Sequence, residues 1–96
     1  MATKLEKTLE ELGLHGPKAT VYIAALQLGP AKGQDIADAA DLPRTTVHEI
    51  LESLQRMGMV SFVTRGRTRL YSAESPAKLE SVLKEKERKL KAIMPE

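Results

Sequence analysis

Arginine is the residue type whose spacing in this 96-residue chain points to chemistry. Residues 43–72 hold five arginines and two glutamates, a net charge of +3, whereas residues 1–42 sum to −2 and residues 73–96 to +1. Affinity for nucleic acid grows with the number of phosphates that Lys and Arg neutralise. A merely solvated surface would not predict this crowding. Although the whole chain carries only +2, its charge distribution therefore favours contact with a nucleic-acid backbone.

The other chemically active residues form no catalytic or metal-binding pattern. His15 and His48 have no cysteine partners, because the chain contains no cysteine, and they lack the HxxxH or HExxH spacing of zinc sites. The sequence has no glycine-rich phosphate loop and no nucleophile elbow, and its carboxylates fall at the ordinary spacing of charged helix faces. We therefore expect no enzyme activity, no metal, no cofactor and no small-molecule site in this chain.

Residues 43–57 predict the helix that presents the basic surface. Apolar residues recur there every three or four positions, which is the period of a helix with one buried stripe. Pro43 suits the first helical position, and Gly58 suits the residue just past the end. The stripe consists of Val47, Ile50, Leu51, Leu54 and Met57, and the opposite face presents Thr45, Thr46, His48, Glu49, Glu52, Ser53 and Arg56.

We interpret this outward face as a recognition surface that enters the major groove of double-stranded DNA. The first turns of a recognition helix are the part that reaches base edges in helix-turn-helix docking. Arg44 could pair with guanine, and Glu49 could accept a hydrogen bond from cytosine N4. The predicted base-reading residues are Arg44, Thr45, Thr46, His48 and Glu49.

Simpler roles stay open for several of these residues. Arg44 could contact only a phosphate, and Thr46 could cap a helix. His48 could be a neutral polar side chain at the edge of the DNA. Glu52 is best explained by an intrahelical pair with Arg56, four residues further on.

The stretches before this helix predict a helix-turn-helix. Residues 4–12 and 17–28 are amphipathic or apolar at helical spacing, and residues 34–40 form a short third helix before a tight turn at Asp41-Leu42. A short helix, a brief turn and a longer helix are the layout of a helix-turn-helix. This pattern alone is not specific, because any small helical bundle contains a similar one. The core must be aliphatic, because the only aromatic residues are Tyr22, Phe62 and Tyr71.

A β-hairpin directly after the recognition helix favours a winged helix-turn-helix: a mainly α fold with a small β-hairpin. Residues 59–64 and 68–73 are rich in β-formers and flank the turn Arg65-Gly66-Arg67. Arginines on an exposed hairpin repel one another, which is easier to explain if an anion lies alongside. We expect the arginine-rich part of this hairpin wing, residues 64–69, to hold the DNA backbone or enter the minor groove. The predicted backbone contacts are Lys32, Gln34, Ser53, Arg56, Arg65, Arg67 and Arg69.

Residues 76–96 predict a last helix that mediates dimerisation. Ser75 can cap this helix, and Pro76 fits its first turn. Its apolar residues fall at alternating spacings of four and three, with Lys86 filling one missing place, which indicates a coiled-coil seam of about two heptads. We expect the helix to pair with its copy while leaning on the winged-helix domain of residues 1–75, in a shortened chain or a naturally short relative. The seam residues are Leu79, Leu83, Lys86, Leu90 and Ile93.

A dimer of this kind would place two recognition helices in successive major grooves of a pseudo-palindromic site. We therefore expect a sequence-specific DNA-binding transcriptional regulator. The alternative is a winged-helix module that binds another protein and no DNA, although such a wing is usually less basic and more apolar. No stretch resembles a signal peptide or a membrane span, so we expect a cytoplasmic, nucleoid-associated homodimer without a membrane partner.

These motifs resemble the N-terminal winged-helix domain of the TrmB family of archaeal and bacterial transcriptional regulators. The resemblance covers about residues 12–83 and rests on LGLHGPKATVYIAALQLG, QDIADAADLPRTTVHEILESLQRMGMV and VTRGRTRLYSAESPAKLESVL. Family members often carry a sugar-sensing domain after the coiled coil; nothing in this chain can be that domain, so no sugar site is carried over. His15 and Lys32 stand where the family usually has small capping residues, and Lys32 would place a cation beside a helix N-terminus that borders a phosphate.

Overall fold

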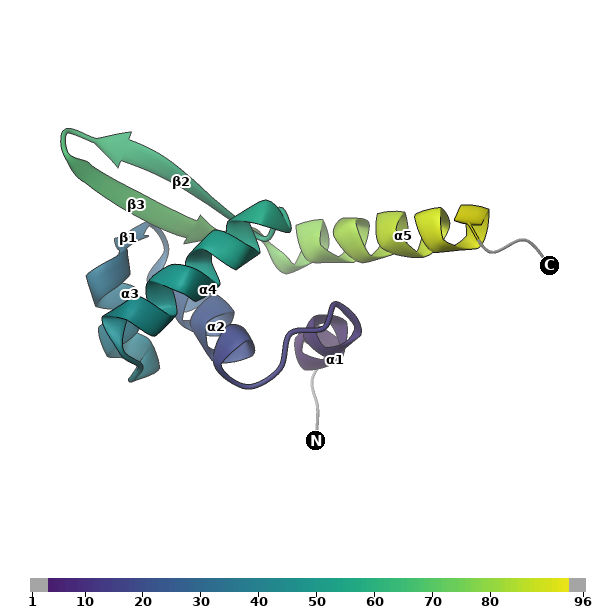
Figure 1. Cartoon of the computed structure of the whole chain (residues 1–96), viewed down its shortest axis with the longest axis horizontal. Coiled ribbons are helices and arrows are strands. Elements are labelled where there is room, and N and C mark those ends of the chain that lie inside the picture. The colour runs from purple at the N-terminus through teal and green to yellow at the C-terminus, as the bar shows by residue number, and fades with distance from the viewer. Residues whose placement is uncertain (1–3, 94–96) are drawn as a thin grey trace.

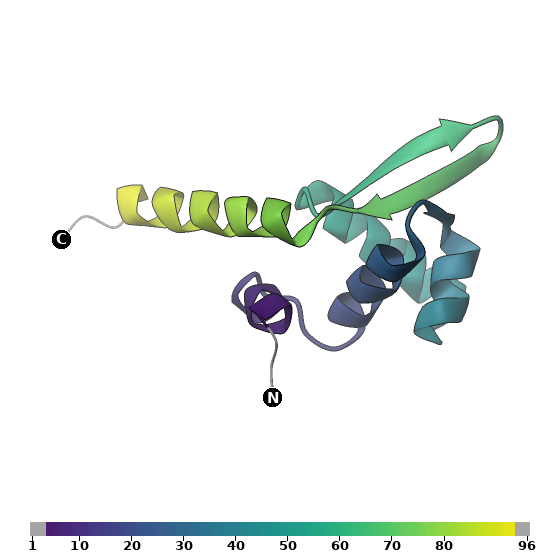
Figure 2. The same ribbon diagram turned by 180° about the vertical axis from the view of Figure 1, so that it is seen from behind.

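The computed structural model describes residues 4–93, which form five helices and a small antiparallel sheet (Figure 1). The β2–β3 hairpin, the wing, extends from one end of the molecule, and α5 projects from the other with α1 beside it (Figures 1 and 2). The elements are α1 (Lys4–Glu11), α2 (Pro17–Leu28), β1 (Ala31–Lys32), α3 (Gly33–Ala40), α4 (Arg44–Arg56), β2 (Val60–Arg65), β3 (Thr68–Ala73) and α5 (Pro76–Ile93).

α3 and α4 form the predicted helix-turn-helix, and one left-handed residue closes its turn. Asp41 has a φ of 56° and lies directly after α3. Its N–H donates to the Asp38 carbonyl at 3.3 Å, and the N–H of Leu42 donates to the Ala37 carbonyl at 3.1 Å. This pair of bonds is the Schellman closure of a helix end, and it turns the chain sharply towards α4.

The two ends of α4 follow the predicted signals with a shift of one residue. Pro43 has extended backbone angles (φ −59°, ψ 142°) and lies immediately before the helix, so its predicted place at the first helical position was wrong by one residue. Its carbonyl still accepts the first helical hydrogen bond, from the N–H of Val47 at 3.0 Å. At the other end, Gly58 has a φ of 79°, which a residue without Cβ adopts without strain.

The core is mainly aliphatic, as the composition predicted, with Tyr22 and Tyr71 as aromatic members. It lies between α2, α3, α4 and the inner face of the sheet, and it continues to α1 and α5. Leu51 and Leu54 on α4 are fully buried, as is Tyr22 on α2. Burying one such side chain contributes roughly 1.5–3 kcal/mol. The largest fully buried side chains are Tyr22, Leu9, Leu14, Ile36, Leu51, Leu54, Met59, Leu79, Val21 and Val47.

The sheet has three strands in the order β1-β3-β2, so the predicted two-stranded hairpin was incomplete. β1 pairs antiparallel with β3, with Ala31 opposite Tyr71 and Lys32 opposite Leu70. This pairing fixes the position of Lys32, the residue directly before α3, against the strand that returns from the wing tip. The winged helix-turn-helix is thus confirmed, with a third strand that joins its wing to its helix-turn-helix.

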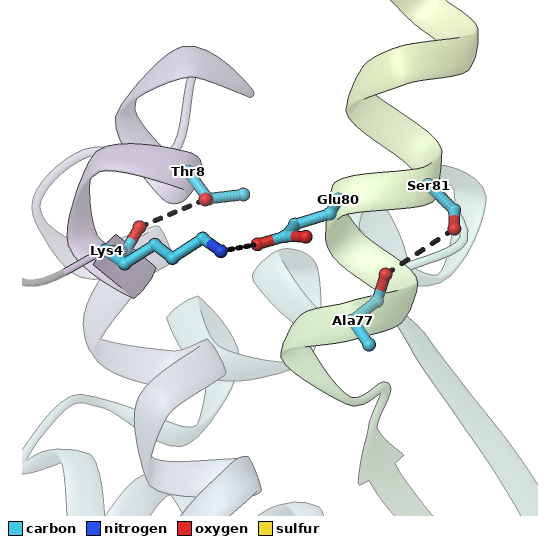
Figure 3. A network of polar contacts seen from close by, with 5 residues as sticks. All are labelled: Lys4, Thr8, Ala77, Glu80 and Ser81. Atoms are coloured by element: carbon cyan, nitrogen blue, oxygen red, sulfur yellow. Dashed lines mark hydrogen bonds and ion pairs between the residues drawn. The ribbon is translucent and has the colours of Figure 1, made fainter.

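α1 packs against the first part of α5, and an exposed ion pair joins the two helices. Lys4 Nζ lies 3.0 Å from Glu80 Oε1, while Thr8 and Ser81 donate to carbonyls of their own helices (Figure 3). An ion pair this exposed adds little stability, so the two helices are held mainly by the hydrophobic core, to which the buried Leu9 and Leu79 both belong. Residues 94–96, the end of the predicted last helix, lie outside the described residues. Within residues 4–93, no helix has both the length and the apolarity that a membrane crossing needs.

Candidate nucleic-acid interface

A groove between the start of α4 and the wing brings together basic residues from three parts of the chain. It has a volume of about 330 Å³ and lies where the end of β1, the first turn of α3, the first turns of α4 and the beginning of β3 meet. The lining residues are Lys32, Gly33, Gln34, Arg44, His48, Leu51, Arg67, Thr68, Arg69 and Tyr71.

Four cations line the groove, and no carboxylate does: Lys32, Arg44, Arg67 and Arg69. All four side chains are exposed, and within the described part of the chain none lies within 4.0 Å of a carboxylate oxygen. Concentrating positive charge without internal neutralisation is unfavourable for the isolated protein. It is favourable once an anion with several charges, such as a nucleic-acid backbone, enters the groove.

The N-terminus of α3 adds a partial positive charge to the same groove. Lys32 occupies its N-cap in an extended conformation, and no side chain caps the first turn. The leading N–H groups of a helix lack intrahelical acceptors and form the positive end of its dipole. Gln34 lies in this turn, but its amide donates to Asp38 Oδ1 at 3.3 Å, so it is already partly engaged.

The predicted base-reading residues share the outer face of α4, but only two of them line the groove. Arg44 and His48 do so, whereas Thr45 and Glu49 are exposed beside it, and Thr46 is half-buried. The groove thus meets the first turns of the recognition helix, and the remaining face stays open to solvent.

Glu52 forms an intrahelical pair, but its predicted partner was wrong. Its Oε1 lies 3.0 Å from His48 Nε2, one turn earlier, instead of pairing with Arg56. Arg56 is exposed at the far end of α4, about 18 Å along the helix axis from Arg44, and it does not line the groove. Ser53 is half-buried and also lies outside the groove.

The wing places two of its three arginines in the groove. Arg65 pairs with Thr68 across the hairpin, which leaves a two-residue loop whose first residue, Gly66, has a φ of 61°. Glycine with positive φ at this place is what a type II′ turn requires. Arg67 and Arg69 line the groove, whereas Arg65 is exposed at the end of β2 and does not line it.

Sequence reasoning missed two aromatic residues beside the groove, Phe62 and Tyr71. The Arg69 guanidinium carbon lies 4.1 Å from the centre of the Phe62 ring, and that ring lies 6.0 Å from the Tyr71 ring at an angle of 50°. Alternation along β3 could have placed Arg69 and Tyr71 on one face. Their relation to Phe62 depends on the register between strands, which no local pattern gives.

The predicted dimer seam divides into buried and exposed parts. Leu79 is fully buried in the core of its own chain and is not exposed for pairing, so its assignment to the seam was wrong. Leu83 is half-buried, Lys86 is exposed, and Leu90 and Ile93 are 55% and 74% exposed. A short apolar stripe on the second half of α5 is therefore exposed in the single chain.

A helix-turn-helix followed by a hairpin wing, with a mainly aliphatic core behind α4, defines a winged helix. The family model described as "Sugar-specific transcriptional regulator TrmB" matches residues 9–77, and the chain belongs to this family.

Similar proteins support both the family and the fold. The chain is 35% identical over 68 residues to the HTH-type sugar sensing transcriptional regulator TrmBL1 of Pyrococcus furiosus; the match covers 71% of this chain and 20% of that protein. The structure of TrmBL2, an archaeal chromatin protein, aligns with a TM-score of 0.77 at 20% identity, over 92% of this chain and 34% of that one. ST1889 of Sulfolobus tokodaii aligns with a TM-score of 0.73 at 22% identity, over 95% of this chain and 98% of that one. The chain thus spans about a fifth of the length of TrmBL1 and a third of that of TrmBL2.

Proposed function

We propose that this chain binds double-stranded DNA sequence-specifically as the DNA-binding part of a transcriptional regulator. The observation that carries the proposal is the groove of Lys32, Arg44, Arg67 and Arg69, which no carboxylate lines. In the bound state, the first turns of α4 enter the major groove and the wing lies along the sugar-phosphate backbone or in the minor groove. This function would place the protein in the cytoplasm, at the nucleoid.

Two copies of the chain bind one pseudo-palindromic site in this proposal. The uncovered Leu90 and Ile93 on α5, which continue from the half-buried Leu83, support pairing, because exposed leucine and isoleucine at seam spacing gain from burial against a second helix. Pairing through the second half of α5 leaves the first turns of both recognition helices free, since α4 begins at its end remote from α5 (Figure 1). The spacing of the two half-sites then follows from the geometry of the α5 pair.

The test is the binding of labelled duplex DNA over a range of salt concentrations, followed by fluorescence anisotropy. Two copies of the chain bring eight groove cations to one site, and each neutralised phosphate contributes about −0.9 to the salt slope. A plot of the logarithm of the binding constant against the logarithm of the salt concentration should therefore have a slope of roughly −7. Replacing Arg67 and Arg69 with Ala should lower both affinity and slope. The same replacement of Arg88, which is exposed on α5 and paired with Glu85, is the matched control and should change neither much. Absence of binding at low salt would contradict the proposal.

The alternative, a protein-binding winged helix, has one observation in its favour. Val63 on the wing is 59% exposed, and its cross-strand partner Leu70 is half-buried, so the wing face that carries this pair is partly apolar. A Val63→Ser variant separates the two functions. Duplex binding should be unaffected by this change if the basic groove is the functional surface.

A further inference from the structure

Arg69 differs from the other wing arginines because an aromatic ring lies beneath its guanidinium. Its guanidinium carbon is 4.1 Å from the centre of the Phe62 ring. In the strand register, Arg69 lies opposite Thr64 and Phe62 lies opposite Tyr71, so Arg69 and Phe62 are diagonal neighbours on one face of the hairpin. Within the described residues, Arg65 and Arg67 have no such ring contact.

The ring is itself held in place. Phe62 is half-buried against the core, and it contacts Tyr71, which is only 4% exposed and directly opposite on β3. A fixed core tyrosine therefore supports the phenylalanine, and the phenylalanine supports the arginine. This stack anchors one guanidinium at the side of the groove, although the arginine itself belongs to an exposed wing.

Stacking occupies the face of the guanidinium and leaves its N–H edges available. Arg binds phosphate through two N–H groups in the plane of the guanidinium, and a ring beneath that plane does not compete for them. A free arginine loses rotamer freedom when it binds, which reduces its net contribution to affinity. An arginine that is already stacked has lost part of that freedom before the ligand arrives.

We propose that Phe62 is a positioning residue for DNA binding: it holds Arg69 in the orientation in which the guanidinium contacts the sugar-phosphate backbone. The inference rests on the proposed function and goes beyond it, because it assigns a role in DNA binding to an uncharged residue that does not line the groove. Arg69 is then the preorganised wing contact, whereas Arg65 and Arg67 become ordered on binding.

A double-mutant cycle on the full chain tests this role. Phe62→Leu should weaken duplex binding by about 2- to 5-fold for each wing engaged, the value of one exposed cation–π contact. The salt slope should not change, because no charge is removed. In the Arg69→Ala background, Phe62→Leu should have no further effect. In the matched Arg65→Ala background it should keep its full effect, and Phe62→Tyr, which keeps the ring, should restore wild-type affinity.

A purely structural role for Phe62 gives a different result. If Phe62→Leu weakened binding equally with and without the Arg69 guanidinium, the ring would act through the fold, and the proposal would be overturned. A Phe62→Leu protein that is folded by circular dichroism yet binds with wild-type affinity would overturn it too.

The stack can also be measured without DNA, which separates this inference from the proposed function. In the free protein, the proton resonances of the Arg69 side chain should be shifted upfield by the Phe62 ring current, and Phe62→Leu should abolish this shift. Absence of the shift contradicts the positioning role even if the wild-type protein binds DNA. Failure of the wild-type protein to bind duplex at low salt contradicts the proposed function instead, and the role of Phe62 with it.

Discussion

The hydroxyl of Tyr22 donates a hydrogen bond to the backbone carbonyl of Glu74, the first of the two residues between β3 and α5. The N–H of Glu74 donates to the carbonyl of Met59 at 2.8 Å. Both backbone polar groups of Glu74 are therefore hydrogen-bonded to buried residues. Tyr22 is fully buried on α2. A side chain from the second helix thus fixes the point at which the chain leaves the wing and enters the proposed dimerisation helix.

Replacing Tyr22 with Phe should destabilise the fold and remove part of its sensitivity to alkaline pH. At neutral pH the removal of this hydrogen bond should cost about 0.5–1.5 kcal/mol. Burial, together with the negative charge of Glu74, raises the pKa of Tyr22 to about 12. Because the unfolded chain releases this proton near pH 10, the stabilisation is complete below pH 10 and is lost as the pH rises towards 12.

Urea denaturation of both proteins between pH 7 and pH 11 measures this effect. The difference in unfolding free energy between wild type and Tyr22→Phe should shrink as the pH rises above 10. Comparing the two proteins cancels the ionisation of the lysines, which they share. A difference that stays constant with pH would show that the Tyr22 hydroxyl is not held as described.

Much of the winged helix could be predicted from local signals in the sequence. The apolar period of residues 43–57, the glycines at positions 58 and 66, and Pro76 each act within a few residues of their own position. β1 could not be predicted, because two residues have no period and their strand exists only through pairing with β3. The groove could be predicted as a set of basic residues, but not as one site with Phe62 beneath Arg69, since strand register is a long-range property.

Leu79 shows a second limit of sequence patterns. Heptad spacing marks which residues share one face of a helix, but it does not say what covers that face. The first apolar position of α5 is covered by the protomer's own core, whereas Leu90 and Ile93 are exposed. The seam prediction was therefore wrong at Leu79, near the start of α5, where the winged-helix domain itself covers the helix.

Two identical substitutions on α5 should have opposite consequences. Leu79→Ala should cost about 2–5 kcal/mol of folding stability, because it leaves a cavity at a fully buried site. Leu90→Ala should leave the stability of the protomer nearly unchanged, because that side chain is 55% exposed, but it should weaken self-association. Urea denaturation measures the change in folding stability, and sedimentation equilibrium of the folded proteins measures the change in self-association. If self-association were the same in wild type and Leu90→Ala, α5 would not be the dimer interface.

Removing the Glu52 carboxylate should strengthen DNA binding. Glu52 is exposed on α4 and pairs with His48, which lines the basic groove, so its charge opposes an approaching phosphate. One unit charge about 10 Å from a phosphate in water is worth roughly 0.4 kcal/mol, so Glu52→Gln should raise affinity about 2-fold at low salt. The gain should disappear at high salt, where exposed charges are screened. Glu87→Gln on α5 is the matched control. An equal gain from both variants would point to net charge rather than to position.

Arg44 and Arg67 line the same groove from different elements and should respond differently to replacement. Arg67→Ala, on the wing, should weaken binding to all duplexes and reduce the salt slope by about 0.9 for each phosphate that is no longer neutralised. Arg44→Ala, on the recognition helix, should instead reduce discrimination at one base pair by about 1–3 kcal/mol, and its effect on random duplex should be smaller. Affinities for a set of duplexes with single base-pair changes, each measured at two salt concentrations, separate the two roles. If both variants weakened every duplex by the same factor, Arg44 would contact phosphate only, and base reading would fall to the exposed face of α4 that begins at Thr45.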